Sequence, residues 1–330
     1  MPNSPFIVAE ISSNHLGDKH LAMDLVIAAK NSGADAVKFQ TYTPEEIAAD
    51  VVIESGPWAG RGYRELYAEG RTPWIWYGEL FELARSIGIV PFASPFSEAA
   101  VGRLEKLDCP IYKIASPEIT HYPLIAAAAR TGKPLIISTG MATLNEIYDA
   151  DEVARSNGCK DITFLHCISS YPAEPADFNL NTMVRLKHHQ FNIGLSDHSL
   201  DPTASIAAVA LGAIVIEKHF TLSRTMGGSD AKFSLEPAEF AELVKACRNA
   251  AAAMGDVQFG CRESEKTSFQ YRRSVWVVRD VKAGEVITKN HLAILRPNYG
   301  AEPSFWDKIV GSTAKYDLAA NSPMLLEYLE

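Results

Sequence analysis

The sequence predicts an α/β protein made of a (β/α)8 barrel, the TIM-barrel fold, followed by a small β-rich module. Eight short apolar runs rich in β-branched residues alternate with segments of helical periodicity over roughly the first 250 residues. Eight successive strand and helix units imply a parallel sheet that closes on itself. After Gly255 this rhythm gives way to a polar stretch and shorter β-like pieces. A doubly wound open sheet is the alternative architecture for the first part.

The predicted strands are separated by enough chain for one helix each. Thr143 followed by Glu146 has the pattern of a capping box at a helix start, and Gly33 and Gly132 are placed to end helices. Each strand is bounded by such signals. The eight predicted strands are residues 6–11, 36–41, 90–96, 111–116, 135–139, 162–169, 192–198 and 214–221.

Two segments interrupt this order. Residues 44–72 form a long connection rich in glycine and in aromatic residues, among them Trp58, Tyr63 and Tyr67. A connection of this length in a compact barrel is often a lid or a binding loop, although its aromatic side chains can equally serve to pack a surface hairpin. The second is the polar stretch after Gly255. It divides the chain into three predicted parts: a barrel domain over 1–258, a linker over 259–272 and the β-rich module over 273–330.

Composition excludes several classes of protein. The 330 residues are 47% hydrophobic and 22% charged, which is typical of a globular protein, and the formal charge of −9 disfavours nucleic acid and anionic membrane surfaces as partners. The apolar run 205–216 is too short to cross a bilayer, and the N-terminal residues lack the basic start of a secretory signal. We therefore expect a cytoplasmic protein. Its five scattered cysteines form no CxxC pair and are expected to be plain thiols.

Polar residues at the strand ends are the candidates for chemistry, because a barrel of this kind carries its active site at the carboxyl ends of its strands. Every predicted strand supplies at least one. Residues two apart on a strand share a face, which pairs Lys38 with Gln40 and Ser196 with His198. The candidates are Glu10, Lys38, Gln40, Ser94, Lys113, Ser116, Glu118, Ser138, Ser169, Ser196, His198 and His219.

Lys38 and Lys113 predict an anion site. Two ammonium groups and several serine hydroxyls that converge in an otherwise acidic protein suit a small, multiply charged anion such as a phosphorylated carboxylate. A single lysine more often caps a helix or pairs with a surface acid. Both of these lysines, however, lie in apolar strand contexts, where an unpaired ammonium would be costly.

His198 and His219 end neighbouring strands and together predict a site for one divalent cation, completed by substrate and water. The alternative is that each is a hydrogen-bonded structural histidine. Glu118 is the candidate acid or base, since it follows Lys113 and Ser116 into the same loop.

These segments resemble the sialic acid synthase family, which makes nine-carbon sugar acids from phosphoenolpyruvate. The resemblance covers nearly the whole chain, and the segment from Arg272 to the end is similar to that family's antifreeze-like (SAF) domain. The matching barrel segments are residues 9–11, 14–15, 37–41, 112–116, 137–141, 194–198 and 217–221.

Within the family, the chain resembles the pseudaminic acid synthases. The features that indicate this branch are residues 72–76, 227–237 and 263–266. The chain also has Leu16 where the N-acetylneuraminate branch tends to have a glutamate. The loss of a carboxylate that faces the sugar suggests a less hydroxylated, deoxy substrate.

The resemblance implies that phosphoenolpyruvate condenses with 6-deoxy-2,4-diacetamido-L-altrose and water, giving pseudaminic acid and phosphate by C–O cleavage. It implies that His198 and His219 hold Mn2+ or Mg2+ as a Lewis acid on the sugar aldehyde. Glu118 would orient water or exchange its proton. The residues implied to bind phosphoenolpyruvate are Lys38, Ser94, Lys113, Ser116, Ser138 and Ser196.

For the sugar, the resemblance implies hydrogen bonds from Asn14, Gln40, Tyr171 and Asp230. It further implies that Arg296 reaches the barrel mouth of a partner subunit, so that the protein is a homodimer with exchanged SAF domains. By itself, Arg296 beside Pro297 would be taken for a surface residue. Ser169 stands where the neuraminate branch has an asparagine. The phosphate contacts made by that loop are therefore expected to differ between this chain and the neuraminate branch.

Three alternatives stay open at this stage. The first is an N-acetylneuraminate or legionaminic acid synthase, which would use N-acetylmannosamine or 2,4-diacetamido-2,4,6-trideoxymannose. The second is a synthase for phosphorylated sugars, although that activity needs a further basic subsite that the sequence does not offer. The third is a protein with an inactive barrel that binds carbohydrate or ice.

Overall fold

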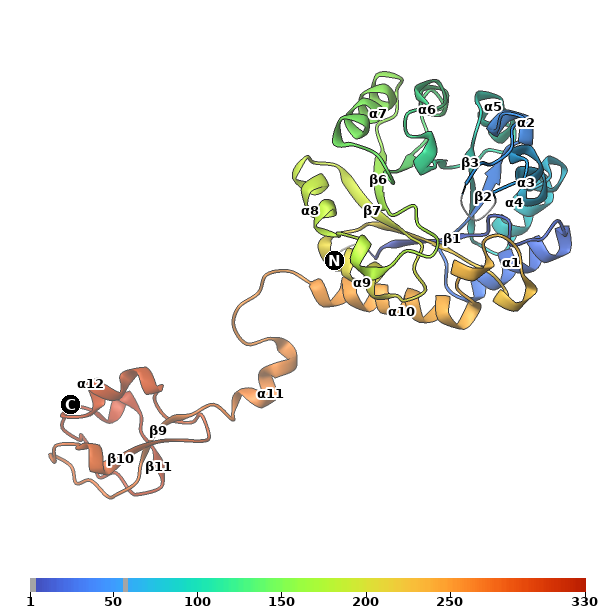
Figure 1. Cartoon of the computed structure of the whole chain (residues 1–330). Coiled ribbons are helices and arrows are strands. Elements are labelled where there is room, and N and C mark those ends of the chain that lie inside the picture. The colour runs from blue at the N-terminus through green and yellow to red at the C-terminus, as the bar shows by residue number, and fades with distance from the viewer. Residues whose placement is uncertain (1–3, 56–58) are drawn as a thin grey trace. The chain divides into compact units, whose positions relative to one another are not determined.

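The computed structural model describes residues 4–55 and 59–330. The chain divides into two compact units, Met1–Asp256 and Val257–Glu330, each of which is described by itself (Figure 1). Trp58, one of the aromatic residues named above, lies outside the described residues.

Eight parallel strands of the first unit close into a barrel in sequence order, with β8 paired to β1 (Figure 1). The register aligns Glu10 with both Lys38 and His219, so these residues of three neighbouring strands lie at one level of the barrel. The predicted (β/α)8 barrel is therefore confirmed. The strands are β1 (Phe6–Glu10), β2 (Ala36–Thr41), β3 (Val90–Pro95), β4 (Tyr112–Ile114), β5 (Leu135–Ser138), β6 (Ile162–Cys167), β7 (Asn192–Asp197) and β8 (Val215–His219).

Seven of these strands are shorter than predicted, and each of the seven ends at least one residue earlier at its carboxyl end. β4 keeps only Tyr112–Ile114 of the predicted residues 111–116, and beyond it Ser116–Glu118 form a 3-10 turn, η2. Pro117 in that turn has no N–H to donate to a sheet. Ser169 and His198 likewise lie beyond the ends of β6 and β7. These side chains are therefore carried by loops above the barrel.

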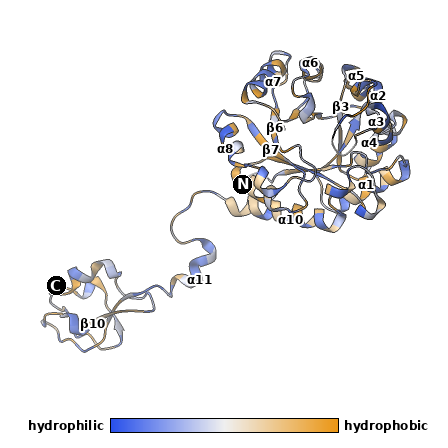
Figure 2. Ribbon diagram, in the orientation of Figure 1, coloured by the Kyte–Doolittle hydropathy of each residue, from blue (hydrophilic) through white to orange (hydrophobic). Residues whose placement is uncertain are grey.

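Helices surround the barrel and carry both hydrophobic and hydrophilic residues along their length (Figure 2). In α7 the side chain of Thr143 accepts a hydrogen bond from the backbone N–H of Glu146, as its capping pattern predicts. The helices that follow the strands are α1 (Lys19–Asn31), α4 (Tyr77–Ser86), α5 (Glu98–Glu105), α6 (Tyr122–Ala129), α7 (Leu144–Ser156), α8 (Asn181–His188), α9 (Thr203–Leu211) and α10 (Pro237–Met254).

Residues 44–72 are not one irregular loop. They include two short helices, α2 (Pro44–Ile47) and α3 (Tyr63–Gly70), and between these helices an antiparallel bridge pairs Val52 with Gly62. The ring of Tyr67 packs edge-on against Tyr42, with 5.6 Å between centroids. Part of the segment therefore packs on the barrel, as one of the two interpretations expected.

Close packing inside the barrel explains Gly194 on β7. A Cβ at that position would lie 2.4 Å from the carbonyl oxygen of Val215 and 2.5 Å from Cδ2 of Leu165, on the two neighbouring strands. Only glycine fits there without moving backbone.

On the outer side of the strands, Lys218 forms a buried ion pair with Asp197. Their side chains are fully buried, and Nζ of Lys218 lies 3.0 Å from Oδ1 of Asp197. Lys218 also donates to the carbonyl oxygen of Ser199, and Ser205 of α9 donates to the other oxygen of Asp197 at 2.6 Å. Because strand side chains alternate, this pair faces away from Glu217 and His219. It links β7 and β8 to the helix layer.

The second unit contains a three-stranded antiparallel sheet in the order β10-β9-β11. Its strands are β9 (Ser274–Val277), β10 (Leu292–Leu295) and β11 (Ser322–Pro323), and a short helix, α12 (Trp306–Ile309), packs with them. Residues that lie between the barrel and this sheet form another short helix, α11 (Lys266–Phe269). The unit has its own small core, formed chiefly by Val275, Val277, Ile287, Ile309 and Met324.

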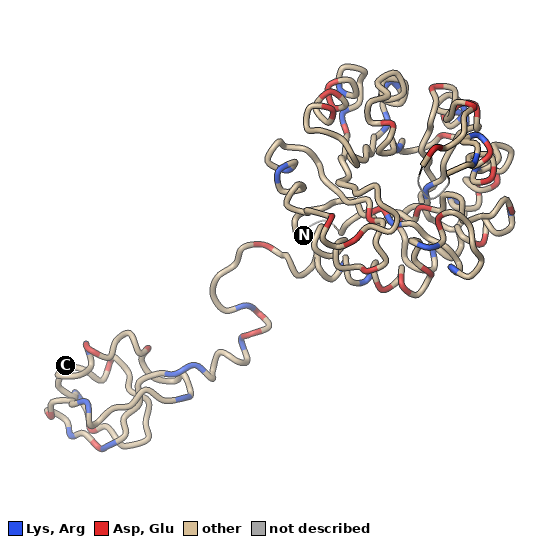
Figure 3. The backbone as a smooth tube through the Cα atoms, in the orientation of Figure 1, with Lys and Arg blue, Asp and Glu red and all other residues tan. Residues whose placement is uncertain are grey.

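Acidic and basic residues are interspersed along both units (Figure 3). Among the residues that the structure describes, no helix is long and apolar enough to span a bilayer. All five cysteines are free thiols.

Candidate active site

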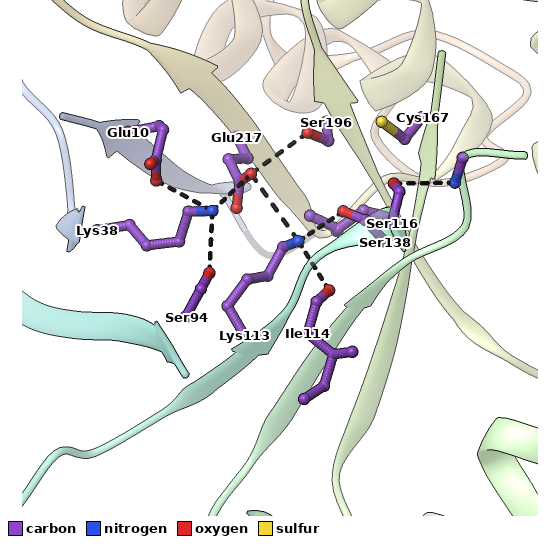
Figure 4. Close-up of polar contacts among 12 residues, drawn as sticks. Glu10, Lys38, Ser94, Lys113, Ile114, Ser116, Ser138, Cys167, Ser196 and Glu217 are labelled. Carbon is purple, nitrogen blue, oxygen red and sulfur yellow. Dashed lines mark hydrogen bonds and ion pairs between the residues drawn. The ribbon is translucent and has the colours of Figure 1, made fainter. Parts of the chain in front are cut away.

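Two lysines meet inside the carboxyl end of the barrel (Figure 4). Lys38 of β2 lies 3.0 Å from Oε2 of Glu10 on β1 and 3.1 Å from Oε1 of Glu217 on β8. Lys113 of β4 lies 4.0 Å from the same oxygen of Glu217. Both lysine side chains are at least 95% buried. Glu217 therefore joins the two ammonium groups.

The predicted serines surround these lysines (Figure 4). Lys113 donates to Oγ of Ser138 at 2.6 Å, and Lys38 lies 3.4 Å from Oγ of Ser94. Ser196 donates to Glu217 at 3.3 Å. The hydroxyl of Ser116 accepts a hydrogen bond from the backbone N–H of Gly140 at 3.1 Å. The structure thus brings together polar groups from most of the strand ends and the loops after them.

Burial and charge act against each other in this cluster. Burial, together with repulsion from Lys38, lowers the pKa of Lys113 to about 8 although Glu217 opposes the change. Burial raises the pKa of Glu10 despite its contact with Lys38, whereas the two lysines outweigh burial and lower the pKa of Glu217. Glu10 is thereby biased toward its neutral form. The two lysines then face the single carboxylate of Glu217, and the remaining positive charge suits an anion.

Glu118 lies in the turn after β4, close enough to Lys113 for that ammonium to act on its ionisation. Burial nevertheless dominates and raises the pKa of Glu118 to about 7. Its Oε2 is buried without a hydrogen-bond partner among the described residues. A carboxyl group of this kind can both give and take a proton near neutral pH.

The imidazole rings of His198 and His219 face each other with 5.3 Å between centroids. Nδ1 of His198 lies 2.9 Å from the carbonyl oxygen of Ile168, so this nitrogen carries the hydrogen and Nε2 is left for a ligand. Nδ1 of His219 is buried without a partner among the described residues. Burial first, and then the neighbouring His198, lower the pKa of His219 well below its usual value, so its ring is neutral.

This pair fits a divalent cation as two nitrogen ligands, one with its orientation fixed by a backbone carbonyl. The carboxylate of Asp230 lies close by, with Oδ2 at 3.8 Å from Nδ1 of His219. Among the described residues, no group of three or more histidine, cysteine, aspartate or glutamate side chains is arranged around one metal position. A cation held here would take its remaining ligands from substrate and water, as the sequence predicts.

Of the residues expected to bind sugar, Gln40 lies beside the lysine cluster and Asn14 lies beside the loop after β8. Gln40 donates from Nε2 to Glu10 at 3.0 Å and to Ser12 at 2.8 Å. Asn14 donates from Nδ2 to the carbonyl oxygen of Phe220 and to Oγ of Ser234, both at 2.9 Å. Its Oδ1 is buried with no partner in the described part of the chain, which leaves an acceptor for a ligand.

Tyr171 covers the histidines from the loop after β6. Its ring centroid lies 4.4 Å from that of His198 and 4.9 Å from that of Phe233, while 49% of the residue stays exposed. Together with Asp230, it places polar groups on the open side of the histidine pair. Arg296 is an exposed residue of the second unit, directly after β10.

Glu217 and Cys167 also belong to this cluster, although neither is among the candidates predicted from the sequence. Glu217 lies two residues before His219 on β8, so the period-two rule that paired Ser196 with His198 also identifies it. Cys167, the last residue of β6, has its sulfur 3.9 Å from Nδ1 of His198. Cys167 lies two residues before the candidate Ser169 in the predicted strand, so the same rule also marks it, although its contact with His198 comes from a neighbouring strand.

The cluster therefore combines a buried anion site, a histidine pair and a carboxyl group that titrates near pH 7, all at one end of the barrel. That arrangement can bind a small phosphorylated acid beside a carbonyl compound and move a proton between them.

Comparison with known proteins gives a consistent result. Residues 25–259 match the model of the NeuB family, and residues 272–329 match that of the SAF domain. Over 338 aligned residues, the chain is 41% identical to a pseudaminic acid synthase of Helicobacter pylori, covering 100% of this chain and 99% of that protein.

Other relatives carry related activities. An N,N'-diacetyllegionaminic acid synthase of Legionella pneumophila is 38% identical, covering 98% of this chain and 94% of that protein. The crystal structure of an N-acetylneuraminic acid synthetase of Leptospira borgpetersenii, in complex with citrate, superimposes with a TM-score of 0.73 at 34% identity. That superposition covers 82% of this chain and 92% of the other.

Proposed function

This chain belongs to the NeuB family and ends in a SAF domain, and from that premise we propose that it is a phosphoenolpyruvate-dependent synthase that makes pseudaminic acid. Its sugar substrate is 2,4-diacetamido-2,4,6-trideoxy-L-altrose. The observation that carries the proposal is that the Lys38 and Lys113 cluster and the His198 and His219 pair occupy the same end of one barrel. Full-length similarity to a pseudaminic acid synthase supports the choice of sugar.

Phosphoenolpyruvate binds at the lysine cluster in this proposal. Its phosphate and carboxylate take up hydrogen bonds from Lys38 and Lys113 and from the hydroxyls of the surrounding serines. The lysines are already held in place by Glu217 before the ligand arrives, so little reorganisation is needed. The serines assigned to this anion are Ser94, Ser116, Ser138 and Ser196.

The reaction forms one carbon–carbon bond and breaks one carbon–oxygen bond. C3 of phosphoenolpyruvate bonds to the aldehyde carbon of the open-chain sugar, and the aldehyde oxygen takes up a proton. Water adds at C2 and gives up a proton. The bond between C2 and the bridging oxygen then breaks, phosphate leaves with that oxygen and takes up the proton of the new C2 hydroxyl group, and C2 becomes the ketone of the product.

Glu118 serves as the proton carrier. Its raised pKa keeps the carboxyl group protonated below about pH 7, so it can give its proton to the aldehyde oxygen as the carbon–carbon bond forms. The resulting carboxylate then takes a proton from the water that attacks C2. The proton given in the first step is regained in the second.

His198 and His219 would hold Mn2+ or Mg2+. When bound, the cation supplies Lewis-acid polarisation of the sugar aldehyde. The chain's own contribution is to orient His198 through the carbonyl oxygen of Ile168 and to keep His219 neutral through burial. Tyr171 excludes water from one side of the pair by packing on His198.

The sugar is bound by Asn14, Gln40, Tyr171 and Asp230 in this proposal. We also propose a homodimer in which Arg296 of one subunit contacts the sugar bound in the other barrel. The exposure of Arg296 is compatible with a residue that acts across an interface. A test is to mix an Arg296→Ala variant with a His219→Ala variant: exchange of the SAF domains would restore part of the activity that each lacks.

The second candidate is a legionaminic or N-acetylneuraminic acid synthase, favoured by 38% identity over nearly the full length to a legionaminic acid synthase. One assay separates the candidates. Phosphate release from phosphoenolpyruvate with Mn2+ is measured with the altrose derivative, with its manno counterpart and with N-acetylmannosamine, each with and without EDTA.

Preference for the altrose derivative, abolished by EDTA, is the expected result. Preference for another sugar would move the enzyme to a different branch of the family. Activity that survives EDTA would remove the metal assignment, and failure of every sugar would leave a protein that binds without catalysis.

A further inference from the structure

A cavity of about 500 Å³ lies beside the candidate active site, and of its lining residues only Leu16 was discussed above, as the position where the neuraminate branch has a glutamate. Helix α3 forms one side of it, and the loops after β1 and β8 form the other. We call it the α3 pocket. It is lined chiefly by Ser13, Leu16, Arg61, Leu66, Glu69 and Ser229.

The α3 pocket is connected to the active site through two of its loops. Ser13 precedes Asn14, and Ser229 precedes Asp230, whose carboxylate lies 3.8 Å from the imidazole of His219. Oγ of Ser13 and Oγ of Ser229 are hydrogen-bonded at 2.6 Å, which joins the two loops. The α3 pocket therefore lies next to Asn14 and Asp230, two residues assigned to the sugar.

Glycine keeps the α3 pocket open where the segments meet. A Cβ on Gly70 would lie 3.3 Å from Cβ of Ser13 and 3.4 Å from the hydroxyl of Tyr42, and one on Gly228 would lie 2.7 Å from Cδ2 of Leu16. Gly228 also has a positive φ of 101°, which disfavours any side chain. Larger residues at these positions would crowd the pocket.

The chemistry of the lining suits a neutral amide that carries a methyl group. Arg61 and Glu69 form an ion pair at 2.6 Å, so their charges cancel, yet together they offer N–H donors and a carboxylate acceptor. An acetamido group needs both, since its carbonyl accepts and its N–H donates. Leu16 and Leu66 add apolar surface for methyl groups. A phosphate, in contrast, would meet a carboxylate and only an already paired cation.

We propose that the α3 pocket binds the end of the sugar remote from its aldehyde. Arg61 donates to the carbonyl oxygen of the 4-acetamido group, and Glu69 accepts from its N–H. The two leucines contact the C6 methyl group. This inference rests on the proposed function and adds to it a specificity site at α3, a helix that carries no other assigned residue.

The test compares Arg61→Ala with Arg64→Ala. Arg64 belongs to the same segment but lies outside the pocket, where it donates to the carbonyl oxygen of Ala48, so it controls for loss of an arginine near α3. The two side chains are 35% and 39% exposed, and both variants should fold with little change in melting temperature.

Arg61→Ala should raise KM for the diacetamido sugar about 10-fold, the scale of one hydrogen bond to a charged group, with kcat and KM for phosphoenolpyruvate unchanged. Arg61→Lys should lie between this variant and the wild type, because it keeps the charge and loses the fork. Arg64→Ala should match the wild type. With N-acetylmannosamine, which has no 4-acetamido group, Arg61→Ala should change KM less than about 2-fold.

A second readout does not depend on turnover. Calorimetry with the alditol obtained by reducing the diacetamido sugar, in the presence of phosphoenolpyruvate, should show the same loss of affinity in Arg61→Ala. If the wild type uses the sugar but Arg61→Ala and Arg64→Ala behave alike, the inference is wrong and the proposed function stands. If none of the sugars elicits phosphate release by the wild type, the proposed function fails and this inference fails with it.

Discussion

The ammonium group of Lys38 lies 3.1 Å from Oε1 of Glu217, although strand β1 separates their two strands in the barrel. The contact crosses the barrel interior, and both side chains are 95% buried. Glu10 on the intervening strand approaches the same ammonium at 3.0 Å. An incoming dianion therefore competes with two carboxyl groups for a cation that is already in position.

Replacement of Lys113 by methionine should lower kcat/KM for phosphoenolpyruvate by about 100-fold or more, because one of two buried cations that face the anion is lost. Lys133→Met is the matched control, since its ammonium pairs with Glu105 near the surface at 2.6 Å. Steady-state phosphate release at saturating sugar measures both. Equal effects in the two variants would contradict the assignment of Lys113.

The pH dependence of kcat/KM should have a limb that depends on Glu118. Burial raises the pKa of this carboxyl group to about 7, so it is protonated below that pH and ionised above it. Because the first step uses the protonated form, activity should fall as pH rises through about 7. Glu118→Gln should be at least about 100-fold slower and should lack this limb. A variant that keeps the wild-type profile would assign the limb to another group.

His219→Ala should lose Mn2+ binding and at least about 100-fold in turnover. Electron paramagnetic resonance of added Mn2+ reports the binding directly, without reference to activity. His188→Ala, which changes an exposed histidine at the end of α8, should match the wild type in both measurements. Full Mn2+ affinity in His219→Ala would exclude the histidine pair as the metal site.

The Lys218→Met variant should have a lower free energy of unfolding than the wild type, while its anion site stays unchanged. It leaves Asp197 as an unpaired charge that is fully buried, and removal of one partner of such a pair costs about 3–5 kcal/mol of unfolding free energy. Urea denaturation measures the change. Lys282→Met, which breaks an exposed pair with Asp317 in the second unit, should have little effect. Similar midpoints for the two variants would mean that the Asp197 pair contributes little.

Sequence reasoning located much of the candidate site because it needed only two rules. The carboxyl ends of barrel strands meet, and alternate residues share a face, so Lys38, Lys113, His198 and His219 could be grouped from the order of residues alone. The family prediction is confirmed by the NeuB and SAF matches. The roles of the individual residues remain predictions.

The same rules failed where position depends on contacts between distant segments. Glu217 lies on the right face of β8, but its contacts with Lys38 and Lys113 depend on the closure of the barrel. For residues 44–72 the sequence predicted a long connection, either a lid or a packed hairpin, but not α2 and α3, which are too short to show a clear helical period.

The sequence by itself determined the barrel, the change of architecture after Gly255 and the set of polar residues at the strand ends, since these follow from local periodicity. The tertiary structure alone decided which charges pair and where space remains. Burial shifts the pKa of Glu118 toward neutrality, and the approach of α3 to the loops after β1 and β8 creates a pocket around Arg61. Both effects depend on desolvation and packing among residues far apart in the chain, which no local pattern encodes.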